Sequence, residues 1–471
     1  MKKNRIIIVG AGEAGQLLSA ELLNNPRNEI VGFIDDDAAK FKLVLSGIGV
    51  LGGRGEINNI IQRELIDTVI VALPSAHKEI IRKTVDDILN NNPQIIVQVL
   101  PSTAKYFETP LFSELRDIPF SDIITRDELK IDISAINKFW ENKTVMITGA
   151  GGSIGSEITK QLLRFKTKTI VCVGRGENSI YNLERSLIQQ HDSRVKYHIC
   201  DIRNSVILNE IMSKYEIDIV VHAAAHKHVP LMENNELEAL HNNVYGTAAL
   251  LRNCVKHNVE RFILISTDKA VNPANVMGST KRIAELVTGY YNKQFGLKTA
   301  VVRFGNVIGS RGSVIPLFLD QIKGGGPVTV THPDVKRFFM SIPEASLLVI
   351  NAASYSQGGD IYILNMGTQY KISEIAERLI RLSGLQPHND IKIEFTGLRP
   401  GEKLEEELIY INEELRDTDN EKIFRIAEKA DIDGDIMNFV GKIERFEFDN
   451  TDILRQETSD IIRKYNVISK L

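Results

Sequence analysis

Two glycine-rich turns, each placed between a strand pattern and a helix pattern, constrain this chain more than any other feature. The first lies in RIIIVGAGEAG (Arg5–Gly15) and the second in TVMITGAGGSIG (Thr144–Gly155). In both, a short apolar run ends in glycines and an amphipathic stretch follows. Glycines at this place permit a tight turn and let a phosphate group approach the helix N-terminus, as in nucleotide-binding βαβ units. The sequence therefore predicts two α/β domains.

Apolar runs that alternate with helical patterns continue after each turn, which indicates parallel sheets. The runs expected as strands are residues 31–37, 67–75 and 94–102 after the first turn, and 169–175, 195–201, 217–225, 261–267 and 298–306 after the second. We predict an α/β fold with two Rossmann-like, doubly wound parallel-sheet domains, the second followed by a small substrate-binding domain. The expected divisions are a first nucleotide-binding domain (1–102), a connector (103–142), a catalytic domain (143–312), a substrate-binding part (313–410) and a charged helical tail (411–471).

Composition excludes several classes of protein. Lys and Arg number 57 against 61 Asp and Glu, which gives a net charge of -4 and no support for a nucleic-acid partner. The three cysteines form no CxxC pair, so a reducing compartment is expected. No apolar run reaches the roughly 18 residues of a membrane helix. The apolar run before the first glycine is too short for a signal peptide. We expect a soluble, cytoplasmic protein with no membrane span, which forms a homo-oligomer.

The first turn has the spacing Gly10-x-Gly12-x-x-Gly15, and Asp35 lies 20 residues further on. An acid at that distance can bind ribose hydroxyls, so these four residues form a candidate second nucleotide site. The alternative, a Rossmann-like domain that keeps the turn for structural reasons and binds nothing, stays open.

The second turn has the wider spacing Gly149-x-x-Gly152-x-x-Gly155, and it resembles the extended short-chain dehydrogenase/reductase superfamily. Further matches follow in order: Asp201 at a strand end, small residues after His222, and Asn243 in NNVYGT. The resemblance implies an NAD(P) site in this second domain. The residues assigned to that site are Gly149, Gly152, Ser153, Ile154, Gly155, Arg175, Asp201, Ile202, Ala223, Ala224, Ala225, Asn243 and Lys281.

A sharper resemblance rests on five segments: AAAHKHVPLMENN, STDKAVNPANVMGSTKRIAE, RFGNVIGSRGSVIP, HPDVKRFFM and GLRPGEKLEEEL. These are similar to the bacterial UDP-N-acetylglucosamine 4,6-dehydratases, in particular the large branch in which a Rossmann domain precedes the catalytic domain. The resemblance implies an NAD-dependent hydro-lyase that makes a 4-keto-6-deoxy sugar nucleotide for surface glycans. Large members usually carry membrane helices ahead of the first Rossmann domain, and this sequence departs from them in showing none.

Asp268 and Lys269 follow the strand pattern RFILIST directly, at the expected active-site edge of the sheet. The resemblance implies Asp268 as general acid, Lys269 as general base at carbon 5, and Thr267 as hydrogen-bond partner of the carbon-4 oxygen. A protonated Asp and a neutral Lys both need shifted pKa values, and we expect burial to shift them. Without this context, a solvated Asp-Lys pair in a loop would be the ordinary interpretation.

Lys281 stands four residues after Met277, so the two share a helix face. Most members of the superfamily have Tyr-x-x-x-Lys here. Lys281 is expected to hold the nicotinamide ribose. In the resembling dehydratases, Met at this position marks the branch that retains configuration at carbon 5, so Met277 is assigned to an active site. The base for the carbon-4 hydroxyl is left open.

The resemblance also implies a substrate site, in which arginine forks suit the UDP diphosphate. The residues assigned to it are His226, Lys227, Asn306, Arg311, Arg337, Arg399 and Glu402. His222, His226 and His228 have a spacing that can ligate zinc, but no clustered carboxylate or cysteine completes the set, so no metal is predicted.

Two other functions stay in view. A UDP-sugar 4-epimerase shares the fold and the substrate class but needs no base at carbon 5. A catalytically silent NAD(P)-sensing or scaffold protein would explain the missing tyrosine and the extra Rossmann domain. The cofactor is expected to be NAD, but Arg175 can accept a 2′-phosphate, so NADP stays open.

Overall fold

The computed structural model describes residues 3–92, 95–100, 116–117, 133–188, 192–383, 385–411, 413–427, 432–448 and 450–465. The chain forms two compact units. Unit 1 comprises residues 1–127, 314–333 and 371–396, and unit 2 comprises residues 128–313, 334–370 and 397–471. Each unit is described separately.

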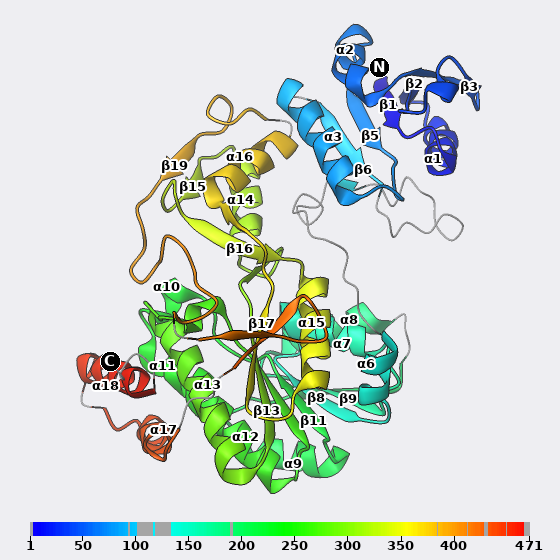
Figure 1. Cartoon of the computed structure of the whole chain (residues 1–471). Helices are drawn as coiled ribbons and strands as arrows, with labels where there is room; N and C mark the ends of the chain where they lie inside the picture. Colours follow the sequence, from blue (N-terminus) through cyan, green and yellow to red (C-terminus); the bar gives the residue numbers. More distant parts are fainter. Residues whose placement is uncertain are drawn as a thin grey trace. The chain divides into compact units, whose positions relative to one another are not determined.

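Unit 1 contains a sheet with the strand order β3-β4-β2-β1-β5-β6-β7 (Figure 1). Its strands are β1 (Asn4–Val9), β2 (Asn28–Ile34), β3 (Val44–Leu45), β4 (Ile48–Gly52), β5 (Thr68–Val71), β6 (Ile96–Val99) and β7 (Arg116–Asp117). The central strands are parallel, and the short edge strands β3 and β7 pair antiparallel.

Helices cover both faces of this sheet because successive side chains of each strand point to opposite faces. Ile6 and Ile8 pack against helix α1 (Glu13–Leu23), whereas Ile7 and Val9 pack against the opposite layer. That layer consists of α2 (Ile57–Arg63) and α3 (Lys78–Asn91), and the 3-10 turns are η1 (Ala38–Lys40) and η2 (Arg54–Glu56). The predicted doubly wound first domain is confirmed.

The later segments of unit 1 form a small group of their own. It contains α14 (Val314–Lys323), β15 (Val328–Val330), α16 (Ile372–Leu382) and β19 (Ile393–Phe395). Strands β15 and β19 pair in parallel.

Unit 2 is built on a larger sheet with the order β10-β9-β8-β11-β12-β13-β17-β21-β20. Its strands are β8 (Thr144–Thr148), β9 (Thr169–Gly174), β10 (Val195–Ile199), β11 (Ile219–His222), β12 (Arg261–Ile265), β13 (Lys298–Arg303), β17 (Asp360–Leu364), β20 (Leu415–Asp417) and β21 (Ile423–Ile426). The strands from β10 to β17 are parallel. This order is that of a Rossmann sheet, so the predicted fold of the second domain is also confirmed.

Two helical layers enclose the unit 2 sheet (Figure 1). One layer contains α6 (Ile133–Trp140), α7 (Ser153–Leu162), α8 (Glu177–Leu187) and α15 (Ile342–Tyr355). The other contains α9 (Ser205–Tyr215), α12 (Gly246–Lys256), α13 (Val276–Phe295), α17 (Asp435–Arg445) and α18 (Thr451–Tyr465). Shorter elements near the sheet edge are α10 (Val229–Met232), α11 (Glu236–Leu240), the π-helical turn η4 (His241–Tyr245), the 3-10 turn η5 (Asp268–Ala270), β14 (Asn306–Val307), β16 (Lys336–Met340) and β18 (Gln369–Lys371).

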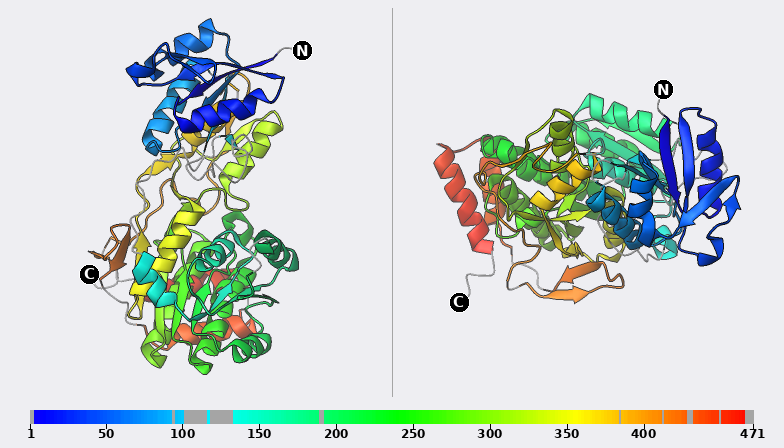
Figure 2. Two further views of the ribbon diagram at one scale, coloured as in Figure 1. Left: turned by 90° about the vertical axis from the view of Figure 1, so that its right-hand side faces the viewer. Right: turned by 90° about the horizontal axis from the view of Figure 1, so that it is seen from above.

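The C-terminal region differs from the expected charged helical tail. Residues 415–426 form β20 and β21, an antiparallel addition to the sheet that Figure 2 shows in orange at its edge. Helices α17 and α18 then pack on α13 through buried residues such as Phe439 and Leu454. Alternation of charged and apolar residues on these helices is therefore the pattern of a docked surface layer.

Residues 313–410, expected as one substrate-binding part, are divided between the units. Helix α15 and strand β17 complete the layers of unit 2 because both are apolar and buried there. Most of the expected connector, residues 103–142, lies outside the described residues, apart from β7 and α6.

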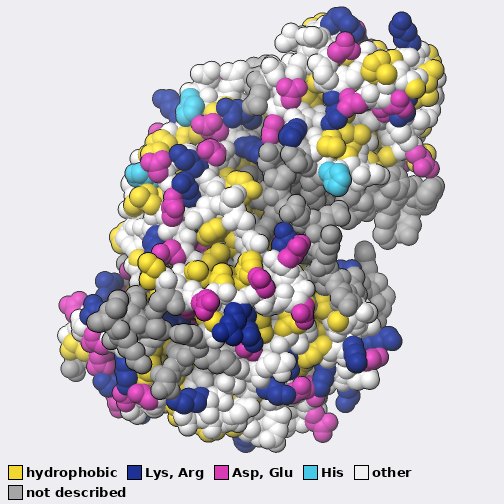
Figure 3. Space-filling model, viewed as in Figure 1, with side chains coloured by type: hydrophobic (Ala, Val, Ile, Leu, Met, Phe, Trp, Pro, Cys, Tyr) yellow, Lys and Arg dark blue, Asp and Glu magenta, His cyan; other side chains and the backbone are white. Residues whose placement is uncertain are grey.

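No helix within the described part of the chain has both the length and the apolar composition that a bilayer crossing requires. On the face that Figure 3 shows, basic and acidic side chains are interspersed.

Candidate active site

The second glycine turn places backbone groups close together at the carboxyl edge of the unit 2 sheet. Gly149 has φ +68°, and a Cβ on it would lie 2.7 Å from the carbonyl of Ala223. A Cβ on Gly155 would lie 2.4 Å from the oxygen of Gly149. Gly152 caps α7, whose N-terminal amides face this edge. The turn therefore has the cradle that a dinucleotide diphosphate fits.

The histidine at the end of β11 is neutral and fully engaged. His222 Nδ1 lies 2.6 Å from Thr148 Oγ1, and Nε2 lies 3.0 Å from Thr247 Oγ1. Burial, together with the charge of Lys281, lowers the pKa of His222 to about 3. Both ring nitrogens are occupied by hydroxyl groups, so His222 has no lone pair free for a metal.

Charged groups surround the end of β9, where the adenosine half of a cofactor would lie. Asp201 accepts hydrogen bonds from the Arg203 guanidinium at 3.0 and 2.7 Å. Arg175 lies 3.8 Å from Asp201 and 3.6 Å from Glu238. Ile202, next to Asp201, is buried against Gly246. Arg175 is thus flanked by two carboxylates.

Asn243 organises the loop after β11 from the π-helical turn. Its Oδ1 accepts from the His226 amide at 2.8 Å, and its Nδ2 donates to the His226 carbonyl at 3.0 Å and to Thr280 Oγ1 at 2.9 Å. A π-turn inside a helix is frequent at functional sites because it redirects side chains. The structure thus gives Asn243 contacts with the protein backbone and with α13.

The acid–base candidates lie together at the end of β12. Thr267 donates a hydrogen bond to Asp268 Oδ1 at 2.8 Å, and Lys269 Nζ donates to the same oxygen at 3.1 Å. Asn306 Oδ1 accepts from Lys269 Nζ at 3.2 Å. Asp268 is fully buried, and its Oδ2 has no hydrogen-bond partner among the described residues. That oxygen is buried beside Gly305.

Lys269 also faces Glu406, with 3.4 Å between Nζ and Oε1. Burial would lower the pKa of Lys269, but the charges of Asp268 and Glu406 outweigh burial and raise the pKa above its ordinary value. The expectation that burial makes this lysine neutral is therefore wrong. Two carboxylates, rather than one, stabilise its ammonium form.

Met277 and Lys281 occupy the first turns of α13. Met277 is buried against Met232 and Ala239. Burial lowers the pKa of Lys281 to about 8. Gly278 brings this helix close to η5, since a Cβ there would lie 2.2 Å from the Lys269 carbonyl oxygen.

The arginines assigned to a diphosphate differ in their surroundings. Arg337 is buried, and its guanidinium donates to the carbonyls of Lys336 and Leu404 and to Glu402 Oε1. The Arg337 guanidinium is therefore hydrogen-bonded to other groups of the protein. The side chains of Arg311 and Arg399 are exposed. The Arg311 amide donates to Ser153 Oγ and the Arg399 amide donates to Glu402 Oε2. Lys227 Nζ donates to Ser310 Oγ at 3.3 Å.

A buried ionic network lies next to η5. Glu285 accepts from Arg303 at 2.9 and 2.8 Å, from Arg282 at 3.1 Å and from Ser266 Oγ at 2.6 Å. Tyr410 Oη donates to the Ala270 carbonyl at 3.0 Å. The network thus reaches the residues on either side of Thr267, Asp268 and Lys269.

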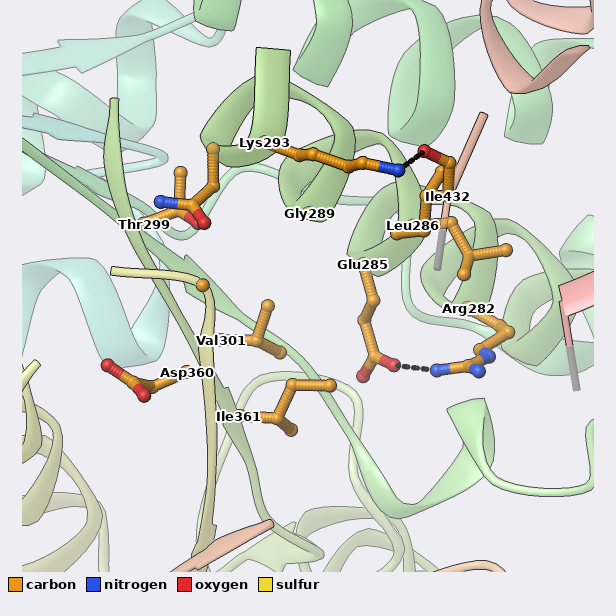
Figure 4. A pocket seen from close by; sticks show the side chains of 12 residues that line it. Arg282, Glu285, Leu286, Gly289, Lys293, Thr299, Val301, Asp360, Ile361 and Ile432 are labelled. Atoms are coloured by element: carbon orange, nitrogen blue, oxygen red, sulfur yellow. Dashed lines mark hydrogen bonds and ion pairs between the residues drawn. The ribbon is translucent and has the colours of Figure 1, made fainter. Parts of the chain in front are cut away.

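A cavity of about 340 Å³ borders this network, between α13 and strands β13 and β17. Figure 4 shows Glu285 joined to Arg282 on one side, and Lys293 bonded to the Ile432 carbonyl on another. The cavity contains none of the acid–base residues, so it is not the candidate active site.

In unit 1, Gly10, Gly12 and Asp35 line a separate cavity of about 390 Å³. Gly15 is buried behind this turn, where a Cβ would lie 1.9 Å from the Gly10 carbonyl oxygen. Burial would raise the pKa of Asp35, but hydrogen bonds from the Asp37 amide, Lys40 and the Ala11 amide outweigh it and lower the pKa. The carboxylate expected to meet a ribose is thus occupied by the protein's own donors.

The sequence does not indicate several charged residues of the site, among them Glu238, Glu285, Arg303 and Glu406. Glu406 lies in the run GEKLEEEL, where four carboxylates look alike. The neighbouring apolar residues give no signal either, since Leu404 is exposed and Leu408 is only half-buried.

Comparison with known proteins places the chain in a family. The model of a family described as polysaccharide biosynthesis protein matches residues 145–428. The chain is 42% identical over 446 residues to the probable polysaccharide biosynthesis protein EpsC of Bacillus subtilis, covering 93% of this chain and 73% of that one. The chain belongs to this family of polysaccharide biosynthesis proteins. It is also 34% identical over 305 residues to a UDP-glucose 4-epimerase of Rickettsia canadensis, covering 63% of this chain and 85% of that one.

Solved structures agree with the fold. Pen from Bacillus thuringiensis superposes with a TM-score of 0.57 at 35% identity, over 61% of this chain and 90% of that one. DesIV, a dTDP-glucose 4,6-dehydratase from Streptomyces venezuelae solved with NAD, superposes with a TM-score of 0.51 at 21% identity, over 56% and 88%. These likenesses support the Rossmann-like fold of unit 2. A second family model, described as a CoA-binding domain, matches residues 1–97.

Proposed function

We propose that this member of the family is an NAD-dependent UDP-N-acetylglucosamine 4,6-dehydratase that supplies a 4-keto-6-deoxy sugar nucleotide for surface polysaccharide, with retention of configuration at carbon 5. Catalysis is assigned to residues 143–410. The observation that carries the proposal is the buried pair of Asp268 and Lys269 at the end of β12. An elimination across carbons 5 and 6 needs an acid and a base side by side, and this pair supplies both.

The cofactor site is supported by backbone geometry. The cradle of Gly149 and Gly155, the N-terminus of α7 and the small side chains after β11 fit a dinucleotide. A bound nicotinamide would supply reversible hydride acceptance from carbon 4 and hydride return to carbon 6. Asp201 and Glu238 flank Arg175, so a 2′-phosphate would meet two carboxylates there, which favours NAD over NADP.

Residues of the chain are assigned to both proton transfers of the elimination, at carbon 5 and at the carbon-6 hydroxyl. Because Lys269 donates to Asp268 Oδ1 at 3.1 Å, transfer of a proton along this contact gives a protonated Asp and a neutral Lys with no change in net charge. Lys269 then removes the carbon-5 proton while Asp268 protonates the departing carbon-6 hydroxyl. Thr267, which donates to Asp268, is placed to bridge this carboxyl and the carbon-4 oxygen.

The test is incubation with UDP-N-acetylglucosamine in heavy water, followed by mass spectrometry and NMR of the product. We expect loss of water and one solvent deuterium at carbon 5. Lys269→Met and Asp268→Asn should each lower turnover by about 10²- to 10⁴-fold, the usual contribution of a general acid or base.

The second candidate is a UDP-sugar 4-epimerase, favoured by the likeness to the Rickettsia enzyme. It would release the carbon-4 epimer with no loss of water and no deuterium at carbon 5. That product, or near-normal dehydration by Lys269→Met, would overturn the assignment. A silent scaffold would convert nothing.

A further inference from the structure

Glu406 places a second buried carboxylate against Lys269. Its Oε1 lies 3.4 Å from Lys269 Nζ and 3.8 Å from Arg337 Nε. The side chain is only 4% exposed, and Oε2 has no hydrogen-bond partner among the described residues. The neighbouring Glu405 and Glu407 are exposed and pair with surface groups. Glu406 is therefore the member of this acidic run that faces the acid–base pair.

The backbone fixes Glu406 at this position from both sides. Before it, Asn275 Nδ2 donates to the Gly401 carbonyl at 3.0 Å, and Lys403 Nζ donates to the Val271 carbonyl at 3.0 Å. At Glu406 itself, Gln369 donates to the carbonyl at 3.2 Å and accepts from the amide at 3.4 Å. The segment is thus tied to the catalytic turn, and the carboxylate is held at the lysine by the fold.

Keeping a carboxylate here has a free-energy cost. An ionised carboxylate taken out of water loses several kcal/mol of hydration unless close partners replace it. Glu406 has cations at 3.4 and 3.8 Å but no short hydrogen bond to either. Such an arrangement stabilises the fold weakly, so its value is expected in the chemistry of the lysine that it faces.

We propose that Glu406 is a positioning residue for Lys269, which fixes the lysine beside Asp268 and Asn306 and stabilises the charge that it gains on taking the carbon-5 proton. The inference rests on the proposed function, since that function assigns the carbon-5 proton to Lys269.

The balance of the step shows why a second carboxylate is needed. The carbon-5 to hydrogen bond breaks and its proton joins Lys269 Nζ. The released electron pair forms the double bond to carbon 6, and the carbon-6 hydroxyl leaves as water with the proton of Asp268. Asp268 therefore begins the step uncharged and cannot offset the ammonium as it starts to form. Glu406 is the carboxylate that faces Lys269 at that moment.

Among the described residues, three charged groups act on the pKa of Lys269. Asp268 of η5 and Glu406 raise the pKa of Lys269, whereas burial and Arg337 of β16 lower it. Asn306 of β14 contributes an uncharged carbonyl. Loss of Glu406 should therefore lower the pKa, so that Lys269 becomes neutral at a lower pH.

The test compares Glu406→Gln with Glu405→Gln, which makes the same charge change one residue away on an exposed side chain. Turnover and deuterium incorporation at carbon 5 are measured from about pH 5 to 10. In Glu406→Gln, turnover should fall by about 10- to 100-fold. The limb on which the rate rises with pH should move about 1 to 2 pH units lower, the usual effect of removing an opposite charge at this distance. KM for the UDP-sugar should be unchanged, and Glu405→Gln should match the wild type.

A limb that stays at the wild-type pH in Glu406→Gln, whatever the rate, would overturn the inference. If the Gln variant does not fold, Glu406→Asp carries the test, because its carboxylate is one methylene further from Lys269. In Glu406→Asp the rising limb of the pH–rate profile should move to lower pH by less than in Glu406→Gln. A limb that stays at the wild-type pH in this variant would also overturn the inference. A wild type that dehydrates nothing at any pH would mean that the proposed function itself has failed.

Discussion

Replacing Glu285 with Gln should destabilise unit 2 more than any change on its surface. The carboxylate is buried and accepts hydrogen bonds from Arg303, Arg282 and Ser266 (Figure 4 shows the bond from Arg282). Removing one member of a buried ion pair leaves its partner uncompensated, which costs about 3 to 5 kcal/mol. Arg303 would keep Glu413 as its remaining charged partner, at 2.9 Å.

The pKa of Glu285 gives a second route to the same magnitude. Burial would raise this pKa, but Arg303 and Arg282 outweigh it and lower the pKa from 4.5 to about 2. A pKa lowered from 4.5 to about 2 corresponds to roughly 3 kcal/mol of stability. Because the folded-state pKa is lowered, this contribution is present above about pH 4.5 and is lost as the pH falls toward 2. The difference between the wild type and Glu285→Gln should therefore shrink below about pH 4.5.

The assay is urea unfolding followed by the fluorescence of Trp140, the single tryptophan of the chain, which is buried in unit 2. The fluorescence of Trp140 reports on unit 2 alone, so unfolding of unit 1 does not contribute to the measured transition. Glu405→Gln, on an exposed pair, should change the free energy of unfolding by less than about 0.5 kcal/mol. A loss below about 1 kcal/mol in Glu285→Gln, or a difference that persists undiminished to about pH 3, would contradict this prediction.

Two further predictions concern the active site. Met277→Tyr should not be needed for turnover and should lower stability by about 1 to 3 kcal/mol, because the larger side chain enters a packed cluster with Met232 and Ala239; an inactive wild type beside an active Met277→Tyr, in the heavy-water assay, would contradict this. Gly149→Ala should cost more than about 1 kcal/mol and abolish NAD binding in calorimetry, because φ is +68° and the new Cβ would lie 2.7 Å from the Ala223 carbonyl. Gly434→Ala is the control, since a Cβ there meets nothing within 4 Å, and equal NAD affinity in both variants would count against the cradle.

The sequence predicts the core of both sheets because parallel strands buried on two faces are continuous apolar runs. It does not predict β7 or β20, since RD and LRD are too short and polar to have a strand pattern. Nor does it predict the π-helical turn at Asn243, because the residues of that turn differ in no regular way from those of an ordinary helix. The division of residues 313–410 between the units depends on long-range packing that no local pattern records.

At the candidate site, the sequence predicts mainly the residues that are neighbours along the chain. Thr267, Asp268 and Lys269 lie together because they follow one strand end, and the structure brings Asn306 to them from the next strand. The expected neutral state of Lys269 takes only burial into account, whereas the charge of Asp268, together with that of Glu406 from a distant segment, raises the pKa of the lysine. Arg337, expected at a diphosphate, contacts the carbonyls of Lys336 and Leu404 and the carboxylates of Glu402 and Glu406.

One segment near the C-terminus completes both the site and its support. Residues 397–413 supply Glu406 to Lys269, and they also supply Tyr410 to the Ala270 carbonyl and Glu413 to Arg303. The stretch of chain that places Glu406 beside Lys269 therefore also contacts η5 through Tyr410. Strands β20 and β21 follow at once and join that stretch to the sheet through β17. The segment that carries Glu406 is therefore continuous with strands of the sheet, in a region that the charge pattern alone describes as a tail.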